Sequence, residues 1–262
     1  MTSFNSQSIL CRCPNDTAKK LDISIFAELD STNTHLKKLA REGSEEGTVI
    51  IAERQTAGRG RLGRSFYSDA NGLYMSLLLR PRVAAENAVH ITAMAAVAMA
   101  KAVERISGKD AQIKWVNDIF INGKKVCGIL CESAFDENAV TDYVVIGAGV
   151  NITEPQGGFP EDIRGVAGAL FPESETAEHR PELAAAFLEE LFKEYEKLNE
   201  GHFLAEYRRR SLVTGRHVAV IAPSGTREGT AIAIDDDCRL VVSFDGGETE
   251  HISTGEVSVR LR

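Results

Sequence analysis

Several features are missing from this sequence of 262 residues. No apolar run is long enough to span a membrane, since the most apolar helical stretch, 93–100, is bounded by Thr92 and Lys101. The N-terminus has no basic segment followed by an apolar one, so nothing in it indicates export. These absences predict a cytoplasmic protein that does not act at a membrane.

Cysteine is scarce. The five cysteines are irregularly spaced: Cys11, Cys13, Cys127, Cys131 and Cys238. An odd, irregular set is typical of reduced thiols. No second Cys or His pair at ligand spacing accompanies Cys11 and Cys13, so this part of an N-terminal extension over residues 1–22 is interpreted as a flexible tail. Cys127 and Cys131 lie in an apolar strand and are expected in the core.

Positive charge is in deficit, with 30 Lys and Arg against 38 Asp and Glu, a formal net charge of -8. This balance argues against a dedicated DNA-binding protein. Segment 58–64, Gly-Arg-Gly-Arg-Leu-Gly-Arg, contains no acidic residue. Arginine supplies planar forks that suit phosphate or carboxylate, and glycine lets the backbone approach a ligand. The segment therefore predicts a site for a particular anion.

The glycines of this segment also fit the pattern of dinucleotide-binding folds, with Gly58, Gly60 and Gly63 as G-x-G-x-x-G. That pattern requires a helix directly after the glycines. Here 65–72 is turn-like and 73–79 reads as a strand. A dinucleotide fold is therefore not expected. A merely solvated arginine loop would leave the interleaved glycines unexplained.

The distribution of apolar residues predicts a sheet covered by helices. Strands are expected at 23–29, 48–53, 73–79, 113–115, 119–121, 125–132 and 143–152. A short helix is expected after one of the possible N-caps at 30–33, running toward Arg41 and ending at Gly43. Further helices are expected over 87–106 and from Pro181 onward, where apolar residues recur every three or four positions. The fold class is α+β, with a mixed, mainly antiparallel sheet layered with helices.

The character of the chain changes after about Leu212. Short strand-like runs follow at 217–221, 231–234, 240–244 and 257–261. They are separated by turn residues, which is typical of a small antiparallel β-barrel. Two domains are expected, a large one over 23–212 and a small C-terminal barrel over 213–262.

Three further clusters lie at or beside these strands. They are Ser31-Thr32-Asn33, the segment 114–118 with the following 125–130, and the glycine-rich segment 147–151. Pairing about an Asn122-Gly123 turn would bring the Asp118 carboxylate near the Lys125 ammonium. Opposite the arginine segment, Lys125 becomes a candidate fourth cation around a phosphate. Gly128 would allow a ligand close to the strand.

Aromatic and histidine side chains are weaker signals. Trp115 is interpreted as a packed aromatic rather than an adenine platform. Phe66 remains open between a core position and stacking on adenine. His35, His90 and His251 lack ligand spacing, so metal binding through histidine is not expected.

Segment 55–64, Gln-Thr-Ala-Gly-Arg-Gly-Arg-Leu-Gly-Arg, together with the 114–118, 125–130 and 147–151 motifs, resembles biotin protein ligase in order and spacing. The resemblance covers about residues 23–262, and 256–260 resembles the closing strand of the family. Val116 stands where the family usually has proline, so the turn is expected to lose some rigidity at most. The chain resembles the enzyme-only form without an N-terminal DNA-binding domain.

The resemblance implies a reaction in two steps. Biotin and MgATP would give biotinyl-5′-adenylate, and biotin would pass to a lysine of a biotin carboxyl carrier domain of an acyl-CoA carboxylase. Mg²⁺ would arrive with ATP rather than on a set of protein side chains. Neither DNA nor a membrane is an expected partner, and the protein is expected to be a monomer or a homodimer.

The resemblance also implies site residues. The catalytic set would be Arg59, Arg61, Lys125 and Asp118, with Asp118 orienting either the acceptor lysine or the metal. The biotin site would comprise Ser31, Thr32, Asn33, Gln55, Gly58, Arg59, Arg61, Lys125 and Gly128. The ATP site would comprise Arg61, Arg64, Phe66, Asn117, Lys125, Asn151 and Arg260.

Two alternative functions are considered, one enzymatic and one non-enzymatic. A lipoate- or octanoate-type acyl ligase would share the fold, but such relatives lack the arginine-glycine segment in this form. A non-enzymatic binder of anions or nucleic acid could use the same segment, although the acidic net charge counts against it.

Overall fold

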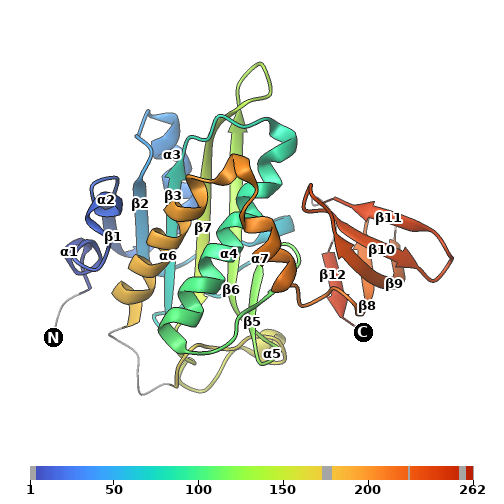
Figure 1. Ribbon diagram of the computed structural model, residues 1–262. Helices are drawn as coiled ribbons and strands as arrows, with labels where there is room; N and C mark the ends of the chain where they lie inside the picture. The colour runs from blue at the N-terminus through green and yellow to red at the C-terminus, as the bar shows by residue number, and fades with distance from the viewer. Residues whose placement is uncertain (1–3, 173–178, 224, 254–257, 262) are drawn as a thin grey trace.

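The computed structural model describes residues 4–172, 179–223, 225–253 and 258–261 (Figure 1). Its centre is a seven-stranded sheet in the order β1-β2-β3-β7-β6-β5-β4. In chain order these strands are β1 (Asp22–Leu29), β2 (Thr48–Gln55), β3 (Gly72–Leu79), β4 (Gln112–Lys114), β5 (Asp118–Ile121), β6 (Lys124–Phe135) and β7 (Thr141–Asn151). Only β1 and β2 pair in parallel, and the other neighbours are antiparallel. The predicted mixed, mainly antiparallel sheet is confirmed.

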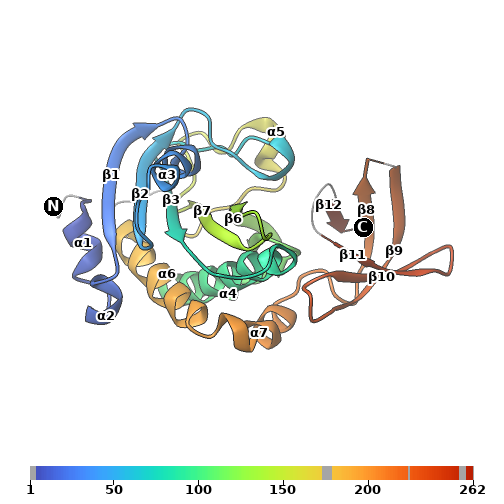
Figure 2. The ribbon, with the colours of Figure 1, turned by 90° about the horizontal axis from the view of Figure 1, so that it is seen from above.

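Helices cover both faces of this sheet (Figure 2). The crossover between the parallel strands is α3 (Thr32–Arg41), whose N-cap Ser31 accepts a hydrogen bond from the Thr34 amide. On the opposite face lie α4 (Ala88–Ser107), α6 (His179–Tyr195) and α7 (Phe203–Arg209). Eleven of the twenty residues of the alanine-rich α4 are buried, and the helix ends at Gly108, which has a left-handed φ of 67°. Among the described residues, no helix is long and apolar enough to cross a membrane.

The C-terminal strands form a second sheet in the order β11-β10-β9-β8-β12. They are β8 (His217–Ala222), β9 (Gly225–Ile234), β10 (Leu240–Phe244), β11 (Thr249–Ile252) and β12 (Ser258–Leu261). The predicted small antiparallel unit is present, but it is an open sheet: within the described residues no pairing joins β11 to β12. These four-residue edge strands pair on one side only, which leaves the expected barrel unclosed. Residues 256 and 257 of the predicted closing strand lie outside the described residues.

The start of the chain differs from the expected flexible tail. Two short helices, α1 (Ser6–Leu10) and α2 (Asn15–Ala18), pack against α6, and Asn5 and Ser8 form a capping box. Ile9 and Cys13 are buried in the main core. Burial raises the pKa of the Cys13 thiol to about 11. The tail interpretation was wrong because these few apolar residues find a partner surface that local sequence does not show.

Candidate active site

A cavity of about 150 Å³ opens between the start of α3, the sheet and the arginine-glycine segment, named here the arginine loop (residues 58–64). Twelve of the predicted site residues line it: Ser31, Thr32, Asn33, Gln55, Arg59, Arg61, Arg64, Phe66, Asn117, Asp118, Lys125 and Gly128. They come from segments far apart in the sequence, and the strand order brings them together.

The arginine loop is held by its own backbone. The Gly60 amide donates to the Arg64 carbonyl at 2.8 Å, and the Phe66 amide donates to the Gly58 carbonyl at 2.8 Å. Between them lies one turn of 3₁₀ helix, η1 (Arg61–Gly63), in which Gly63 has a φ of 71°. Gly58 does not line the cavity. A Cβ there would lie 2.4 Å from Ser68 Oγ, so its glycine allows the base of the loop to pack.

Cationic groups gather on one side of the cavity. Lys125 Nζ lies 2.7 Å from Asp118 Oδ1, which confirms the pairing predicted about the hairpin turn. Arg61 Nη1 donates to Asn117 Oδ1 at 3.4 Å, and burial lowers the pKa of Arg61. Arg59 pairs with Glu132 at 3.1 Å.

Lys114 adds a cation that was not among the predicted site residues, although it belongs to a quoted motif. It lines the cavity, and burial is the main cause of its lowered pKa, which Asp118 opposes. The positive charges of Lys125, Arg260 and Arg64 lower this pKa further. Such clustering of like charge favours an anionic ligand, which would relieve the repulsion.

A second set of lining residues is polar and neutral. Thr32 donates from its backbone amide to Gln55 Oε1 at 2.9 Å, and Gln55 Nε2 donates to Ser68 Oγ at 2.9 Å. Ser76 Oγ lies 2.8 Å from Thr32 Oγ1 and 2.6 Å from Asn33 Oδ1. The fully buried Ser76 was missed, although a lone polar residue within the apolar 73–79 strand was a usable signal.

The floor of the cavity depends on glycines in β6 and β7. A Cβ at Gly147 would lie 2.0 Å from Asn33 Oδ1, and one at Gly149 would lie 2.6 Å from Phe66 Cε1. A Cβ at Gly128 would likewise lie 3.1 Å from Phe66 Cε2. The alternation of glycines on one strand face therefore makes room for two side chains of the site. Phe66 is a half-buried cavity wall, edge-on to Tyr74.

Three hydrogen bonds hold the segment 115–117 before β5. Trp115 Nε1 donates to the Cys238 carbonyl at 2.9 Å, and the Tyr207 hydroxyl donates to the Val116 carbonyl at 2.9 Å. Asn117 Nδ2 donates to the Ile129 carbonyl at 2.6 Å. Trp115 is thus a packed aromatic, as predicted, and it connects the two sheets. The Val116 position is held by Tyr207, from a helix that the sequence did not predict.

Besides Gly58, two predicted site residues do not line the cavity. Asn151 Nδ2 donates to the Gly168 carbonyl at 2.9 Å and so anchors the loop after β7. Arg260, on β12, is exposed and acts on the cavity through its charge on Lys114. Cys127 is buried as predicted, and burial raises the pKa of the half-buried Cys131 to about 12.

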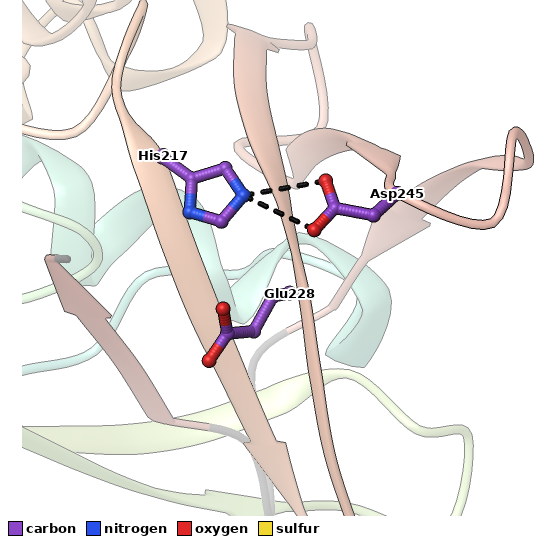
Figure 3. A group of neighbouring side chains, drawn as sticks. All are labelled: His217, Glu228 and Asp245. Carbon is purple, nitrogen blue, oxygen red and sulfur yellow. Dashed lines mark hydrogen bonds and ion pairs between the residues drawn. The ribbon is translucent and has the colours of Figure 1, made fainter.

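A separate cluster lies on the small sheet, where His217, Glu228 and Asp245 approach one another (Figure 3). Their possible ligand atoms all lie within 4.8 Å. His217 Nε2 is 3.2 Å from both Asp245 oxygens. None of the three lines the cavity, and an exposed pair of this kind contributes little to stability.

Comparisons with known proteins show which family this chain resembles. Residues 25–151 match the Biotin/lipoate A/B protein ligase family, and residues 213–260 match the Biotin protein ligase C terminal domain. A Biotin--[acetyl-CoA-carboxylase] ligase of Mycobacterium tuberculosis is 33% identical, over 92% of this chain and 89% of the relative. The Bifunctional ligase/repressor BirA of Bacillus subtilis is 33% identical, over 84% of this chain and 68% of the relative.

A solved structure has the same fold. The biotin protein ligase of Aquifex aeolicus, in complex with biotin and ATP, superposes with a TM-score of 0.78 at 28% identity, over 92% of this chain and 99% of that one. The likeness therefore extends over both sheets and not only over the arginine loop. On the sequence relatives and on this structure, the chain belongs to the biotin protein ligase family.

Proposed function

We propose that the cavity binds biotin and ATP together and joins them. The protein is an ATP-dependent biotin–protein ligase, as its family membership shows. The observation that supports the residue roles is that one cavity is lined by a neutral polar set, Ser31–Asn33 and Gln55, and by a cationic set, Arg59, Arg61 and Lys125.

Each set of residues suits one part of the ligands. The ureido ring of biotin is a neutral edge of donors and an acceptor, which hydroxyl and amide groups can match. The biotin carboxylate and the α-phosphate are both anions that repel each other as they approach. Fixed cations that contact both anions stabilise the charge that develops between them.

The chemistry then proceeds in two displacements. A biotin carboxylate oxygen forms a bond to the α-phosphorus while the bond from that phosphorus to pyrophosphate breaks. The acceptor lysine amine next attacks the acyl carbon. The bond from that carbon to the oxygen that bridges to phosphorus breaks, and AMP leaves with this oxygen and the electron pair of the bond. The new amide nitrogen then loses a proton. Among the described residues that line the cavity, Asp118 is the one carboxylate and is available to the acceptor amine.

Magnesium fits this arrangement as a companion of ATP. Mg²⁺ is held mainly by phosphates and water, with one or two carboxylates from the protein, and it supplies charge neutralisation. Asp118 could contribute such an oxygen, beside Lys125 at 2.7 Å. The nucleotide would lie toward Arg64 and Phe66, with Asn151 and Arg260 at its outer side.

Other parts of the assignment are also proposals. The division into a catalytic domain over 23–212 and a small domain over 213–262 is supported by the two separate sheets. The acceptor would be a biotin carboxyl carrier domain, without DNA and with one or two copies of this chain.

The direct test is ATP–pyrophosphate exchange by the purified protein with Mg²⁺, with biotin and lipoate in separate reactions. Exchange that requires biotin and falls in Arg59→Ala would support both the reaction and the role of the arginine loop. Exchange with lipoate alone would change the substrate, and no exchange with either acid would refute the proposed chemistry.

A further inference from the structure

Glu132, on β6, connects the arginine loop to the start of α3 without lining the ligand cavity. Its Oε1 lies 3.1 Å from Arg59 Nη1 and 2.6 Å from Lys37 Nζ, and its Oε2 accepts from Asn33 Nδ2 at 3.0 Å. Its side chain is only 19% exposed. Glu132 lines a neighbouring cavity of about 310 Å³, and Arg59 and Arg61 line both cavities. The carboxylate therefore lies behind the groups that face the ligands.

The contact with Arg59 uses one nitrogen only. Both distances within hydrogen-bonding range, 3.1 Å to Oε1 and 3.3 Å to Oε2, involve Nη1. Among the described residues, Nε and Nη2 of Arg59 have no hydrogen-bond partner. A guanidinium has five N–H donors in a planar fork. Glu132 thus fixes one corner of the group and leaves the other donors available to an anion in the cavity.

The contact with Asn33 fixes the orientation of its amide. The two Nδ2 hydrogens are directed to the Leu130 carbonyl at 3.1 Å and to Glu132 Oε2 at 3.0 Å. On its other side, Asn33 Oδ1 accepts from Ser76 Oγ at 2.6 Å. With both donors used, Asn33 presents only an acceptor to the cavity. An acceptor is what an N–H group of a ureido ring requires.

We propose that Glu132 is a positioning residue for the first reaction step, acting on two groups that line the cavity. It holds the Arg59 guanidinium over the cavity for the reacting anions, and it keeps the Asn33 carbonyl oxygen directed at the ureido edge. The inference rests on the proposed function of the cavity and adds a residue to it. Glu132 is half-buried, and desolvation by burial raises its pKa. Hydrogen bonds from Lys37 and Asn33, with the charges of Lys37 and Arg59, together lower the pKa by more, so the net shift is downward and the carboxylate stays charged at neutral pH.

In the opposite role, Glu132 would compete with biotin for Arg59. A carboxylate that merely occupied Arg59 would have to be displaced by biotin, and its removal would strengthen binding. The single-nitrogen contact favours positioning, because an incoming anion can use the remaining donors without breaking the pair. The two roles predict changes of opposite sign, which makes them separable.

The test compares Glu132→Gln with wild type by calorimetric titration of biotin and by biotin-dependent pyrophosphate exchange. We expect biotin to bind about 10-fold more weakly, as for one lost hydrogen bond. We expect kcat for exchange to fall about 10- to 100-fold because Arg59 is no longer held in place. Lys37→Ala is the matched control: it removes the third partner of Glu132 but keeps its contacts with Arg59 and Asn33, so both values should remain within about 2-fold of wild type.

A double-mutant cycle shows whether Glu132 acts through its partners. In an Arg59→Ala background, Glu132→Gln should lower kcat by less than about 3-fold, and in an Asn33→Ala background it should barely change biotin affinity. Glu132→Asp, which keeps the charge, should recover part of the loss even if Glu132→Gln is less stable. Additive effects, or tighter biotin binding by Glu132→Gln, would overturn the proposal. A wild-type protein without biotin-dependent exchange would instead refute the proposed function itself.

Discussion

Two regions of this molecule use arginine in opposite ways. At the junction of α4 and α7, Arg210 is 4% exposed and donates from all three nitrogens, to Glu104, Glu206 and the Ala111 carbonyl. In the arginine loop, Arg59 is 44% exposed and uses only Nη1, toward Glu132. The same side chain thus stabilises the fold in one place and stays available to a ligand in the other.

The difference indicates how function can be read from hydrogen bonding. A buried guanidinium must have its donors satisfied by the protein, because an unpaired buried charge is costly. A guanidinium that is to bind a substrate anion must keep donors in reserve, and the fold then holds it by few contacts. The number of unsatisfied donors therefore separates these two arginines more clearly than their neighbouring sequence does.

The largest expected effect comes from removing the junction arginine. Arg210→Ala would leave the Glu104 and Glu206 carboxylates without their buried partner and lower the free energy of unfolding by about 3–5 kcal/mol. Arg59→Ala should lower it by less than about 1 kcal/mol, because that pair is partly exposed. Urea unfolding followed by circular dichroism measures both. Equal losses of stability would remove the distinction between the two regions.

The next effect concerns the glycines beneath the cavity. In Gly149→Ala the new Cβ would lie 2.6 Å from Phe66 Cε1, so the ring must move. We expect a loss of about 1–3 kcal/mol in stability from overpacking, together with weaker ATP and biotin binding. The control is Gly165→Ala, where a Cβ meets nothing within 4 Å. If both variants bound their ligands like wild type, the close packing at Gly149 would have no role in the site.

A smaller effect is expected from pH at the junction. Contacts with Arg209 and Arg210 lower the pKa of Glu206 from 4.5 to about 2, with the hydrogen bond from Arg209 as the largest cause. A lowered pKa means that the ionised form stabilises the folded state. This contribution is present above pH 4.5 and is lost as the pH falls toward 2.

Unfolding measured across this pH range should show the stability falling toward acid, with a shallower slope in Glu206→Gln. The same variant should leave biotin-dependent exchange at neutral pH nearly unchanged, since Glu206 does not line the cavity. An unchanged slope would mean that the junction arginines do not depend on this carboxylate.

Much of the site could be predicted because its chemistry lies in short local motifs. The Asn122-Gly123 turn placed Asp118 and Lys125 on neighbouring strands. A bulge sets Asp118 opposite Gly128, and the long Lys125 side chain, opposite Phe120, reaches back to the carboxylate. The apolar runs of β3 and β7 gave their strand positions to within two residues. Family resemblance then suggested the proposed roles of these residues, which spacing alone could not.

What was missed depends on contacts between distant segments. Glu132 reads as one acidic residue in a strand until β6 and α3 bring Asn33, Lys37 and Arg59 to it. The seven-residue α7 lacks a strong periodic signal, yet the hydroxyl of its Tyr207 donates a hydrogen bond to the Val116 carbonyl. Such contacts follow from tertiary packing, which one sequence does not display.

The smallest expected effect tests the link between the two sheets. Trp115→Phe removes the indole N–H that donates to the Cys238 carbonyl at 2.9 Å while keeping an aromatic ring in the core. One buried hydrogen bond is lost, so the free energy of unfolding should fall by about 0.5–1.5 kcal/mol. Tyr67→Phe, which removes an exposed hydroxyl contact with Asp69, is the control and should change stability less.

Because Trp115 also borders the cavity beside Asn117, Trp115→Phe should raise the KM for ATP more than the KM for biotin if the nucleotide lies near these residues. If the KM rose equally for ATP and biotin, Trp115 would contribute to the stability of the fold, as Arg210 does, and not to nucleotide binding in particular.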